Sequence, residues 1–502
     1  MRILRLYIAR HLILRDLDLR FDRRGRIDTG AYALDFLVGV NGSGKSTVLR
    51  TLAQIINDLH AGRPTEFEYT LTYELHRREE PEVVTITRER STTSMVVRQG
   101  DVDGPVIVEP SAVDITYLPK RVVVHTTGNE SSWASLQQKM AQTIDPPQAD
   151  ESLLTDAAQR SIVELPGHLP RQETAEAEEG ESPYLLIRES RLPITTLCGL
   201  LANLTQGESA PLSEVLDSLE LAGLAGFSLR FRLHSRLSDM TVFEKLRPLA
   251  TRYVRQGNDH LLVFNIPEPV EAAAAFADSL LKPFENALGL FDALDQQQEL
   301  SPSGEPTLQQ INLFLQRNAV QTEAEEAVVD EMSHLLLLEW LSDGERSFLG
   351  RMALLAMLDT DDSLILLDEP EVHFNDYWKR EIVKLLDTVM RNHSNHLLIV
   401  SHSSIALSDV TEAQIMVLQR PGGGFTTVQT PGLKTFGTDP SEIMVVLFRT
   451  DLSVGALAAQ LLETAVKSGD QEELQNFLNR VGPGMWRFRL RDRLEGLNAP
   501  ST

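Results

Sequence analysis

A short glycine-rich segment near the start of the chain has the residue types and the spacing of a phosphate-binding loop. Residues 39–47, GVNGSGKST, match the pattern G-x-x-x-x-G-K-S/T at every required position. Glycines let the backbone wrap closely, so that its N–H groups point at phosphate oxygens. Lys45 is expected to reach the β- and γ-phosphates of a nucleotide, and the Ser46 hydroxyl is expected to bind Mg²⁺. The expected nucleotide-binding residues of this loop are Asn41, Gly42, Ser43, Gly44, Lys45, Ser46 and Thr47.

Two adjacent carboxylates form the second candidate group. The apolar run 364–367 is followed at once by Asp368 and Glu369. Such a run predicts a buried parallel strand that ends at the nucleotide. Asp368 is expected to hold Mg²⁺ together with Ser46, and Glu369 is placed to polarise the attacking water as a general base. Strands that end in acidic residues are common, so this strand indicates a catalytic site only because the chain also has a phosphate loop.

The elements that must position these groups can be read from the hydrophobic periodicity. Residues 33–40 predict the strand that feeds the loop, and residues 48–53 predict the helix that leaves it. Alternating apolar and polar residues predict two strands before the loop and an antiparallel meander after it. The expected strands are 3–8, 12–21, 67–75, 83–87, 95–97, 106–108 and a buried strand at 117–124. These patterns predict an α/β fold in which an antiparallel meander follows the phosphate loop and its helix.

A further motif lies upstream of the carboxylates. Residues 341–346, LSDGER, precede an apolar helical stretch at 348–358. The motif resembles the LSGGQ-type signature of ABC ATPases, in the LSxGE form of their SMC, RecF and OLD relatives. The resemblance implies an ABC-type P-loop ATPase head, in which a mixed central sheet packs beside an antiparallel side sheet. It also implies ATP and Mg²⁺ as cofactors. It also implies that Ser342, Gly344 and Glu345 contact the nucleotide held by Lys45 of a second copy. Hydrolysis would then require two chains closed head to tail over two nucleotides.

A histidine follows another apolar run. Residues 397–400 precede Ser401 and His402. A histidine after a strand is usually structural, because His side chains are often half-buried. Here the loop, the signature, the acidic strand and the histidine occur in the chain order of ABC ATPases, so His402 resembles their switch histidine. Lys45, Glu369 and His402 are therefore the expected catalytic residues.

The resemblance becomes narrower after the acidic strand. Residues 368–378, DEPEVHFNDYW, resemble the DEPExHLNPxW segment of ATPases grouped with the OLD family, especially those of Septu and retron-linked anti-phage systems. Residues 401–410, SHSSIALSDV, resemble their THSPxxLSDV, with Ser404 where proline is usual. The resemblance covers residues 1–128 and 335–460. It implies a homodimer or higher homo-oligomer that works with a separate effector, a nuclease. No Asp-x-Asp pair follows His402, so we expect that the chain is not itself a nuclease.

The remaining segments suggest four regions. They are an N-terminal ATPase lobe at 1–128, a mainly helical insertion at 129–307, a C-terminal ATPase lobe at 308–430 and a helical extension at 431–502. The insertion shows no heptads, so it is not expected to be a coiled-coil arm; scaffolding and partner sensing are both open roles for it. Expected elements from this part onward are an acidic stretch at 172–183, helices at 192–204, 212–224, 271–294 and 308–338, and strands at 227–233 and 260–266.

Composition limits the partners. The 502 residues carry a formal charge of −25, which opposes non-specific duplex binding. Arginines still cluster at residues 2–26 and 480–493, and these are either solvated faces interleaved with Asp or a nucleic-acid groove. The single Cys198 suits a reducing cytoplasm. No apolar stretch approaches the roughly 20 residues that span a bilayer, so we expect no membrane partner.

Two other function classes compete with an effector-regulating ATPase. A DNA-repair or DNA-clamp ATPase of RecF or SMC type is the main alternative, although missing coiled coils and strong acidity count against it. The motor of a membrane transporter is disfavoured, because residues 125–128, HTTG, stand where ABC ATPases usually carry the Q-loop and contain no glutamine.

Overall fold

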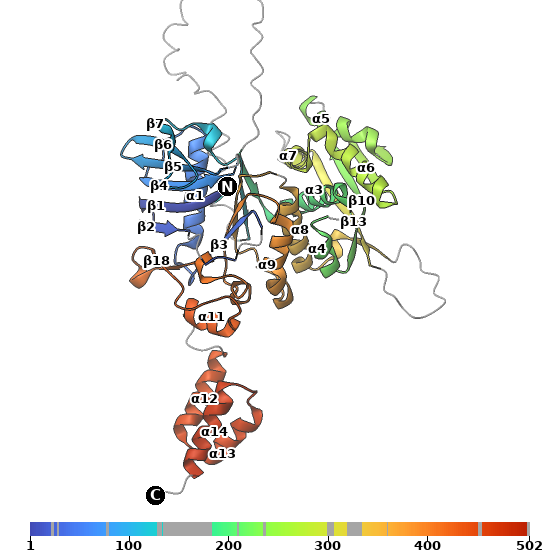
Figure 1. Ribbon diagram of the computed structural model, residues 1–502. Helices are drawn as coiled ribbons and strands as arrows, with labels where there is room; N and C mark the ends of the chain where they lie inside the picture. The colour runs from blue at the N-terminus through green and yellow to red at the C-terminus, as the bar shows by residue number, and fades with distance from the viewer. Residues whose placement is uncertain are drawn as a thin grey trace, which may run out of the picture.

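The computed structural model describes residues 1–21, 25–27, 30–76, 80–127, 133, 183–207, 210–233, 237–298, 306–318, 334–358, 360–449 and 454–498. Three β-sheets and the helices that pack on them account for most of this part of the chain (Figure 1). The acidic stretch expected at 172–183 lies outside the described residues except for Pro183.

The central sheet contains the strands that lead to the predicted chemistry. Its order is β18-β17-β3-β16-β15-β8-β9, and all neighbours are parallel except β17 and β18. The apolar runs of β3, β8, β15 and β16 are fully buried, because both faces of the sheet are covered. The strands are β3 Ala33–Val38, β8 Val122–Thr126, β9 Tyr184–Ile187, β15 Leu364–Asp368, β16 His396–Val400, β17 Ile415–Gln419 and β18 Thr427–Gln429.

A six-stranded antiparallel side sheet and helix α1 (Lys45–His60) cover one face of the central sheet. The side-sheet order is β2-β1-β4-β5-β6-β7. Its strands are β1 Arg2–His11, β2 Leu14–Arg20, β4 Tyr69–Leu75, β5 Glu82–Glu89, β6 Thr92–Gln99 and β7 Val106–Ser111. One core joins Leu6, Leu37, Leu49, Leu71, Leu366 and Leu398 from these three layers. The predicted α/β fold with a mixed central sheet and an antiparallel side sheet is confirmed.

Helices α3 (Leu192–Thr205), α8 (Asp343–Met357) and α9 (Asp376–Met390) belong to the core on the other face. Alternate residues of β3, β15 and β16 point to opposite faces of the sheet. Leu37, Leu366 and Leu398 point into the first core, and Phe36, Ile365 and Ile399 point into this second core. Helices α3 and α8 approach very closely at Gly199, where an added Cβ would lie 2.3 Å from the Ala353 carbonyl oxygen. The insertion is therefore packed directly against the helix that begins at the signature.

The helices of the insertion pack on a five-stranded antiparallel sheet, in which β13 and β14 lie beyond residue 307, the expected end of the insertion. The order is β11-β12-β10-β13-β14, and Phe227, Phe264 and Leu313 from one face of it enter the same core as α3. The strands are β10 Leu221–Arg232, β11 Arg252–Gln256, β12 Asp259–Asn265, β13 Leu308–Arg317 and β14 Leu335–Leu337. The helices are α4 Ser213–Ser218, α5 Leu237–Leu246, α6 Val270–Leu281 and α7 Ala287–Gln298.

Three helix predictions in this region are wrong. Residues 308–317 form strand β13 and not a helix, because Ile311, Leu313 and Leu315 recur with the period of two that faces one side of a sheet. The helix expected at 212–224 ends at Ser218, and β10 begins at Leu221. The helix expected at 271–294 is two helices, separated by a short 3₁₀ segment that contains Pro283, whose missing N–H interrupts the α-helical ladder.

The C-terminal part is helical. Helix α10 (Ser404–Leu407) lies between β16 and β17, and α11 (Pro440–Leu447) follows β18. Helices α12 (Ala456–Ser468), α13 (Gln471–Arg480) and α14 (Met485–Asn498) build a small core of their own (Figure 1). Its buried residues are Ala459, Leu462, Leu474, Trp486 and Leu490. None of the helices in the described ranges combines the length and the apolar character needed to cross a lipid bilayer.

Candidate nucleotide-binding and catalytic site

The register of the central sheet brings four strand ends to one edge. Asp368, at the end of β15, pairs with Val400 at the end of β16 and with Thr126 at the end of β8. Val400 pairs in turn with Leu37, near the end of β3. Because these strands are parallel, the segments that follow them emerge side by side. The phosphate loop, the two carboxylates and His402 are those segments, so the sheet gathers them in one place.

The phosphate loop has the backbone that its glycines permit. Gly42 and Gly44 have φ of 77° and 102°, in the left-handed region that favours glycine. An added Cβ at Gly44 would lie 2.6 Å from Thr426 Oγ1. That hydroxyl donates a hydrogen bond of 2.9 Å to the Ser43 carbonyl, so Thr426 buttresses the loop from beside β18. The loop motif contains no sign of this contact, because Thr426 lies far along the chain.

Lys45 and Ser43 both have polar groups suited to a phosphate. Lys45 Nζ is buried and donates to the carbonyl oxygens of Gly39 (3.0 Å) and Val40 (3.3 Å). Burial lowers the pKa of Lys45. A nearby anion would raise this pKa again, because it favours the charged ammonium. Ser43 Oγ is buried and has no hydrogen-bond partner within the described ranges, while Asn41 and Gly42 are exposed. A buried ammonium and an unused hydroxyl beneath an open loop fit a nucleotide phosphate.

Ser46 and Asp368 meet as expected for a metal-binding pair. Ser46 Oγ donates a 3.0 Å hydrogen bond to Asp368 Oδ1. Burial raises the pKa of Asp368, and the neighbouring charge of Glu369 acts in the same direction, although the Ser46 bond opposes both. A divalent cation would favour the ionised carboxylate again. Hydroxyl and carboxylate oxygens are ligands that Mg²⁺ prefers, so this pair fits Mg²⁺.

Glu369 and His402 face each other next to that pair. His402 Nε2 lies 3.3 Å from Glu369 Oε1, within ion-pair distance but without hydrogen-bond alignment. The imidazole holds the pKa of Glu369 below its usual range. Both side chains are partly exposed, at 39 % and 31 %. A half-open carboxylate that stays ionised can accept a proton from water, which is what a general base must do.

The backbone of Glu369 is strained. Its φ is 55°, a left-handed conformation that costs a non-glycine residue roughly 1–2 kcal/mol. Such a conformation persists only where the surroundings hold it. Three hydrogen bonds near it, made by Thr127 and Glu371, were not predicted from the sequence. Thr127 Oγ1 donates to the Glu369 carbonyl (3.2 Å), and the buried Glu371 carboxylate accepts from Ser401 Oγ (2.6 Å) and from the His402 N–H (2.8 Å).

Of the two residues Thr127 and Glu371, only Thr127 has a signal in the sequence by which it could have been found. Thr127 belongs to the HTTG segment that stands in place of a Q-loop, and the sheet register puts it beside the carboxylates. Glu371 anchors the backbone of the histidine segment to the segment after β15. Glu371 therefore positions His402.

The signature residues form the start of α8 and not part of the phosphate loop. Ser342 caps the helix: its Oγ accepts from the Glu345 N–H (3.3 Å), and the Glu345 carboxylate accepts from the Ser342 N–H (2.8 Å). Ser342 and Asp343 are exposed. An added Cβ at Gly344 would lie 2.6 Å from the His373 carbonyl oxygen, so glycine lets the helix start touch the segment after β15. Asn375, in that segment, caps α9 by accepting from the Trp378 N–H.

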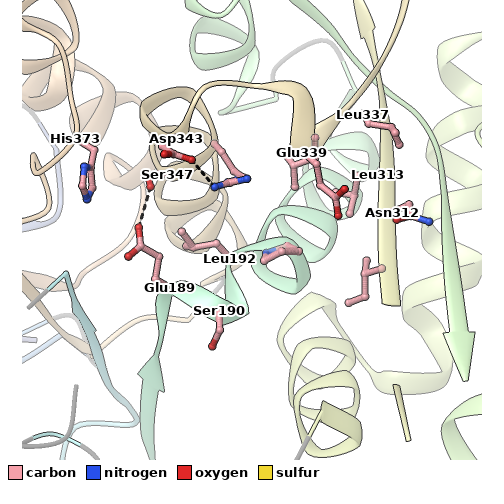
Figure 2. A pocket seen from close by; sticks show the side chains of 14 residues that line it. Glu189, Ser190, Leu192, Asn312, Leu313, Leu337, Glu339, Asp343, Ser347 and His373 are labelled. Carbon is pink, nitrogen blue, oxygen red and sulfur yellow. Dashed lines mark hydrogen bonds and ion pairs between the residues drawn. The ribbon is translucent and has the colours of Figure 1, made fainter. Parts of the chain in front are cut away.

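A cavity of about 420 Å³ opens beside the signature (Figure 2). It lies between the start of α3, strands β13 and β14 and the start of α8. Figure 2 shows Glu189 directed at Ser347, whose Oγ donates to it at 3.2 Å. Asp343 also pairs with the guanidinium of Arg346, at 2.6 Å. The insertion and the signature helix therefore share a partly open surface that is lined by both polar and apolar residues.

Three arginines near the N-terminus are paired with acidic neighbours. Arg5 and Arg20 both contact Asp18, at 2.7 and 2.8 Å, and Arg26 makes a buried pair with Asp35. This arrangement favours a solvated, charge-balanced face over a basic nucleic-acid groove.

Several solved SMC head domains are similar to this chain at low identity. The SMC head domain from Thermotoga maritima is 11% identical, covering 86% of this chain and 100% of that chain with a TM-score of 0.34. The Smc head domain with an extended coiled coil bound to the C-terminal domain of ScpA, derived from Pyrococcus furiosus, is 12% identical, covering 86% and 96% with a TM-score of 0.29. An SmcHead bound to the C-winged helix domain of ScpA is 10% identical, covering 86% and 98% with a TM-score of 0.32. TM-scores of this size identify neither a function nor a partner.

One family is defined by a sequence match over most of the chain. Residues 36–409 match the AAA_21 family, described as "AAA domain, putative AbiEii toxin, Type IV TA system". The matched range begins in β3, just before the phosphate loop, and ends after His402. It therefore contains the phosphate loop, both carboxylates and His402. The chain therefore belongs to the AAA_21 family of AAA-domain ATPases.

Proposed function

We propose that this chain hydrolyses ATP in a dimer that closes head to tail over two nucleotides, and that the dimer regulates a separate effector. The observation that carries the catalytic part is the meeting of Glu369 and His402 beside the Ser46–Asp368 pair, at the edge where the phosphate loop emerges. This is the arrangement that phosphoryl transfer to water requires: a phosphate cradle, a metal-binding pair and a base.

Each residue has a distinct role in this proposal. Lys45 balances phosphate charge, and Ser46 and Asp368 hold Mg²⁺. The metal, when bound with ATP, supplies charge neutralisation at the phosphates. Glu369, which is ionised at neutral pH, orients a water and accepts its proton. His402 holds the Glu369 carboxylate in place.

The exposure of the signature supports a dimer. Ser342 lies at an open helix start, and its neighbour Trp340, in the 3₁₀ turn Leu338–Trp340, is 68 % exposed. Tyr377, close to the Asn375 cap, is 56 % exposed. Large exposed aromatic side chains are enriched where proteins associate. A second copy that covers the signature would bury both.

Trp340 offers a direct measurement of closure. The other three of the four tryptophans, Trp133, Trp378 and Trp486, are buried at 2 %, 7 % and 6 % exposure, so Trp340 dominates quenching by acrylamide. Adding ATP and Mg²⁺ to the Glu369→Gln variant is expected to lower the Stern–Volmer constant at least about twofold, because interface cores exclude solvent. Trp340→Phe is the matched control and should remove the change. Unaltered quenching in a sample that binds ATP would contradict closure over the signature.

The proposal also states which kind of effector the dimer regulates, namely a separate nuclease. It is supported by the resemblance of residues 368–378 and 401–410 to ATPases of Septu and retron-linked anti-phage systems, which implies a nuclease partner in bacterial defence. The family description names a toxin of a toxin–antitoxin system, which is also a system of two components. The insertion packs on the signature helix through Gly199 and Ala353, so in this proposal a partner bound to the insertion would act on that helix.

Expression from the native operon tests this part. A neighbouring nuclease is expected to co-purify with the tagged ATPase, and phage protection is expected to need both genes. Full protection by this gene alone, with no partner recovered, would overturn the effector role. Tight, salt-sensitive DNA binding by the isolated dimer would favour a DNA clamp instead.

A further inference from the structure

Arg351 is a buried arginine that the roles assigned so far do not use. It lies on α8, the helix that begins at the signature, and is 3 % exposed. Its Nη1 donates to the carbonyl oxygens of Pro370 and Val372 (3.1 Å for Val372). Its guanidinium lies 5.0 Å above the ring of Phe374. These three contacts all fall on the segment that follows Glu369, so Arg351 joins the signature helix to that segment.

His125 fixes the orientation of the guanidinium. Arg351 Nε donates to His125 Nε2 at 2.9 Å, and His125 Nδ1 lies 3.1 Å from the Ile187 carbonyl oxygen. Burial lowers the pKa of His125 to about 3, so the ring is neutral at pH 7. A neutral ring that accepts at Nε2 must carry its proton on Nδ1, which then donates to Ile187. Burial lowers the pKa of Arg351 only to about 10, so the guanidinium stays charged.

The segment that Arg351 contacts, residues 369–374, begins with Glu369, whose backbone is strained. Glu369 has φ of 55°, and His373, at the other end of the segment, has φ of 73°. Left-handed residues of this kind are kept by contacts around them. On the side of β16, Glu371 holds the segment to Ser401 and His402. On the side of α8, the described contacts to the Pro370 and Val372 carbonyls come from Arg351.

We propose that Arg351, oriented by His125, is a positioning residue that holds the Glu369 carboxylate in its catalytic place and ties it to the signature helix of the same chain. This inference rests on the proposed role of Glu369 as general base. A planar fork is needed, because a single guanidinium reaches the imidazole and two carbonyl oxygens at once. A lysine keeps the charge but has neither the fork nor the stacking face.

Arg351→Lys is therefore expected to lower kcat about 10–100-fold, as small displacements of a catalytic group do. The affinity for a fluorescent ATP analogue is expected to change less than about threefold, because the phosphate loop is not touched. The matched control is Arg380→Lys, an exposed arginine on α9, which should behave as wild type. His125→Leu, which removes the acceptor and leaves Arg351, should give the same kcat-specific loss and serves if Arg351→Lys does not fold.

Combination with Glu369→Gln separates positioning from a general structural role. If Arg351 acts through Glu369, Arg351→Lys should add less than about a twofold loss to the residual rate of Glu369→Gln. A full further loss, or weakened ATP binding with an early thermal unfolding, would assign Arg351 to fold stability and overturn the inference. A wild-type kcat in both Arg351→Lys and His125→Leu would overturn it too. The proposed function is judged separately, by Glu369→Gln alone.

Discussion

Replacing Glu369 with glutamine is expected to lower the rate of ATP hydrolysis about 10²–10³-fold, within the range that a general base contributes. Glutamine has nearly the same shape but cannot take a proton from water. Because Lys45, Ser46 and Asp368 are unchanged, ATP binding should persist within about threefold. Single-turnover hydrolysis and titration with a fluorescent ATP analogue measure the two quantities. ATP that is bound but not cleaved should also hold the dimer closed.

The matched control is Glu442→Gln, an exposed glutamate on α11 that should leave hydrolysis unchanged. A Glu369→Gln rate near that of the wild type would remove Glu369 from the role of base. In that case His402, 3.3 Å from its carboxylate, would be the next group to test.

Replacing Ser342 with arginine is expected to abolish hydrolysis while ATP binding persists. Ser342 is exposed at the start of α8, outside the strand ends that hold the phosphate loop, so its own nucleotide should bind normally. An arginine there would obstruct the nucleotide of the partner copy. Loss of the helix cap costs about 1 kcal/mol, which is small against the stability of a large fold.

Ser342→Thr is the control for the cap. Threonine keeps the hydroxyl that accepts from the Glu345 N–H, so helix α8 stays capped and most of the activity should remain. Normal hydrolysis by Ser342→Arg would show that the signature does not seal a nucleotide site.

The fold class and the family-defining motifs could be predicted because their signals are local. Residues 39–47 carry their loop geometry in their own glycines, and the apolar run 364–367, which ends in two carboxylates, indicates a buried strand that leads to the nucleotide. Once the strands are parallel, register alone brings Asp368 beside Thr126 and Val400. The meeting of the phosphate loop, the carboxylates and His402 follows from the sheet.

The supporting contacts could not be predicted, because they join residues that are distant along the chain. Thr426 supports the phosphate loop, Glu371 holds the backbone of His402, and Arg351 reaches His125. None of these pairs has a fixed spacing in the sequence. The helix expected at 308–338 is wrong for a related reason: β13 gains its partner β10 only through tertiary pairing, and a run rich in leucine does not by itself distinguish strand from helix.

In the proposed dimer, each ATP is bound by one copy and covered by the signature of the other copy. Mixing the Glu369→Gln variant with the Ser342→Arg variant before ATP is added tests this arrangement most directly. Each variant alone should be inactive, but the mixed dimer contains one site with an intact Glu369 from one chain and an intact Ser342 from the other. Random mixing should therefore restore about a quarter of the wild-type rate. A mixture as inactive as its two components, in a sample shown to contain mixed dimers, would contradict the claim.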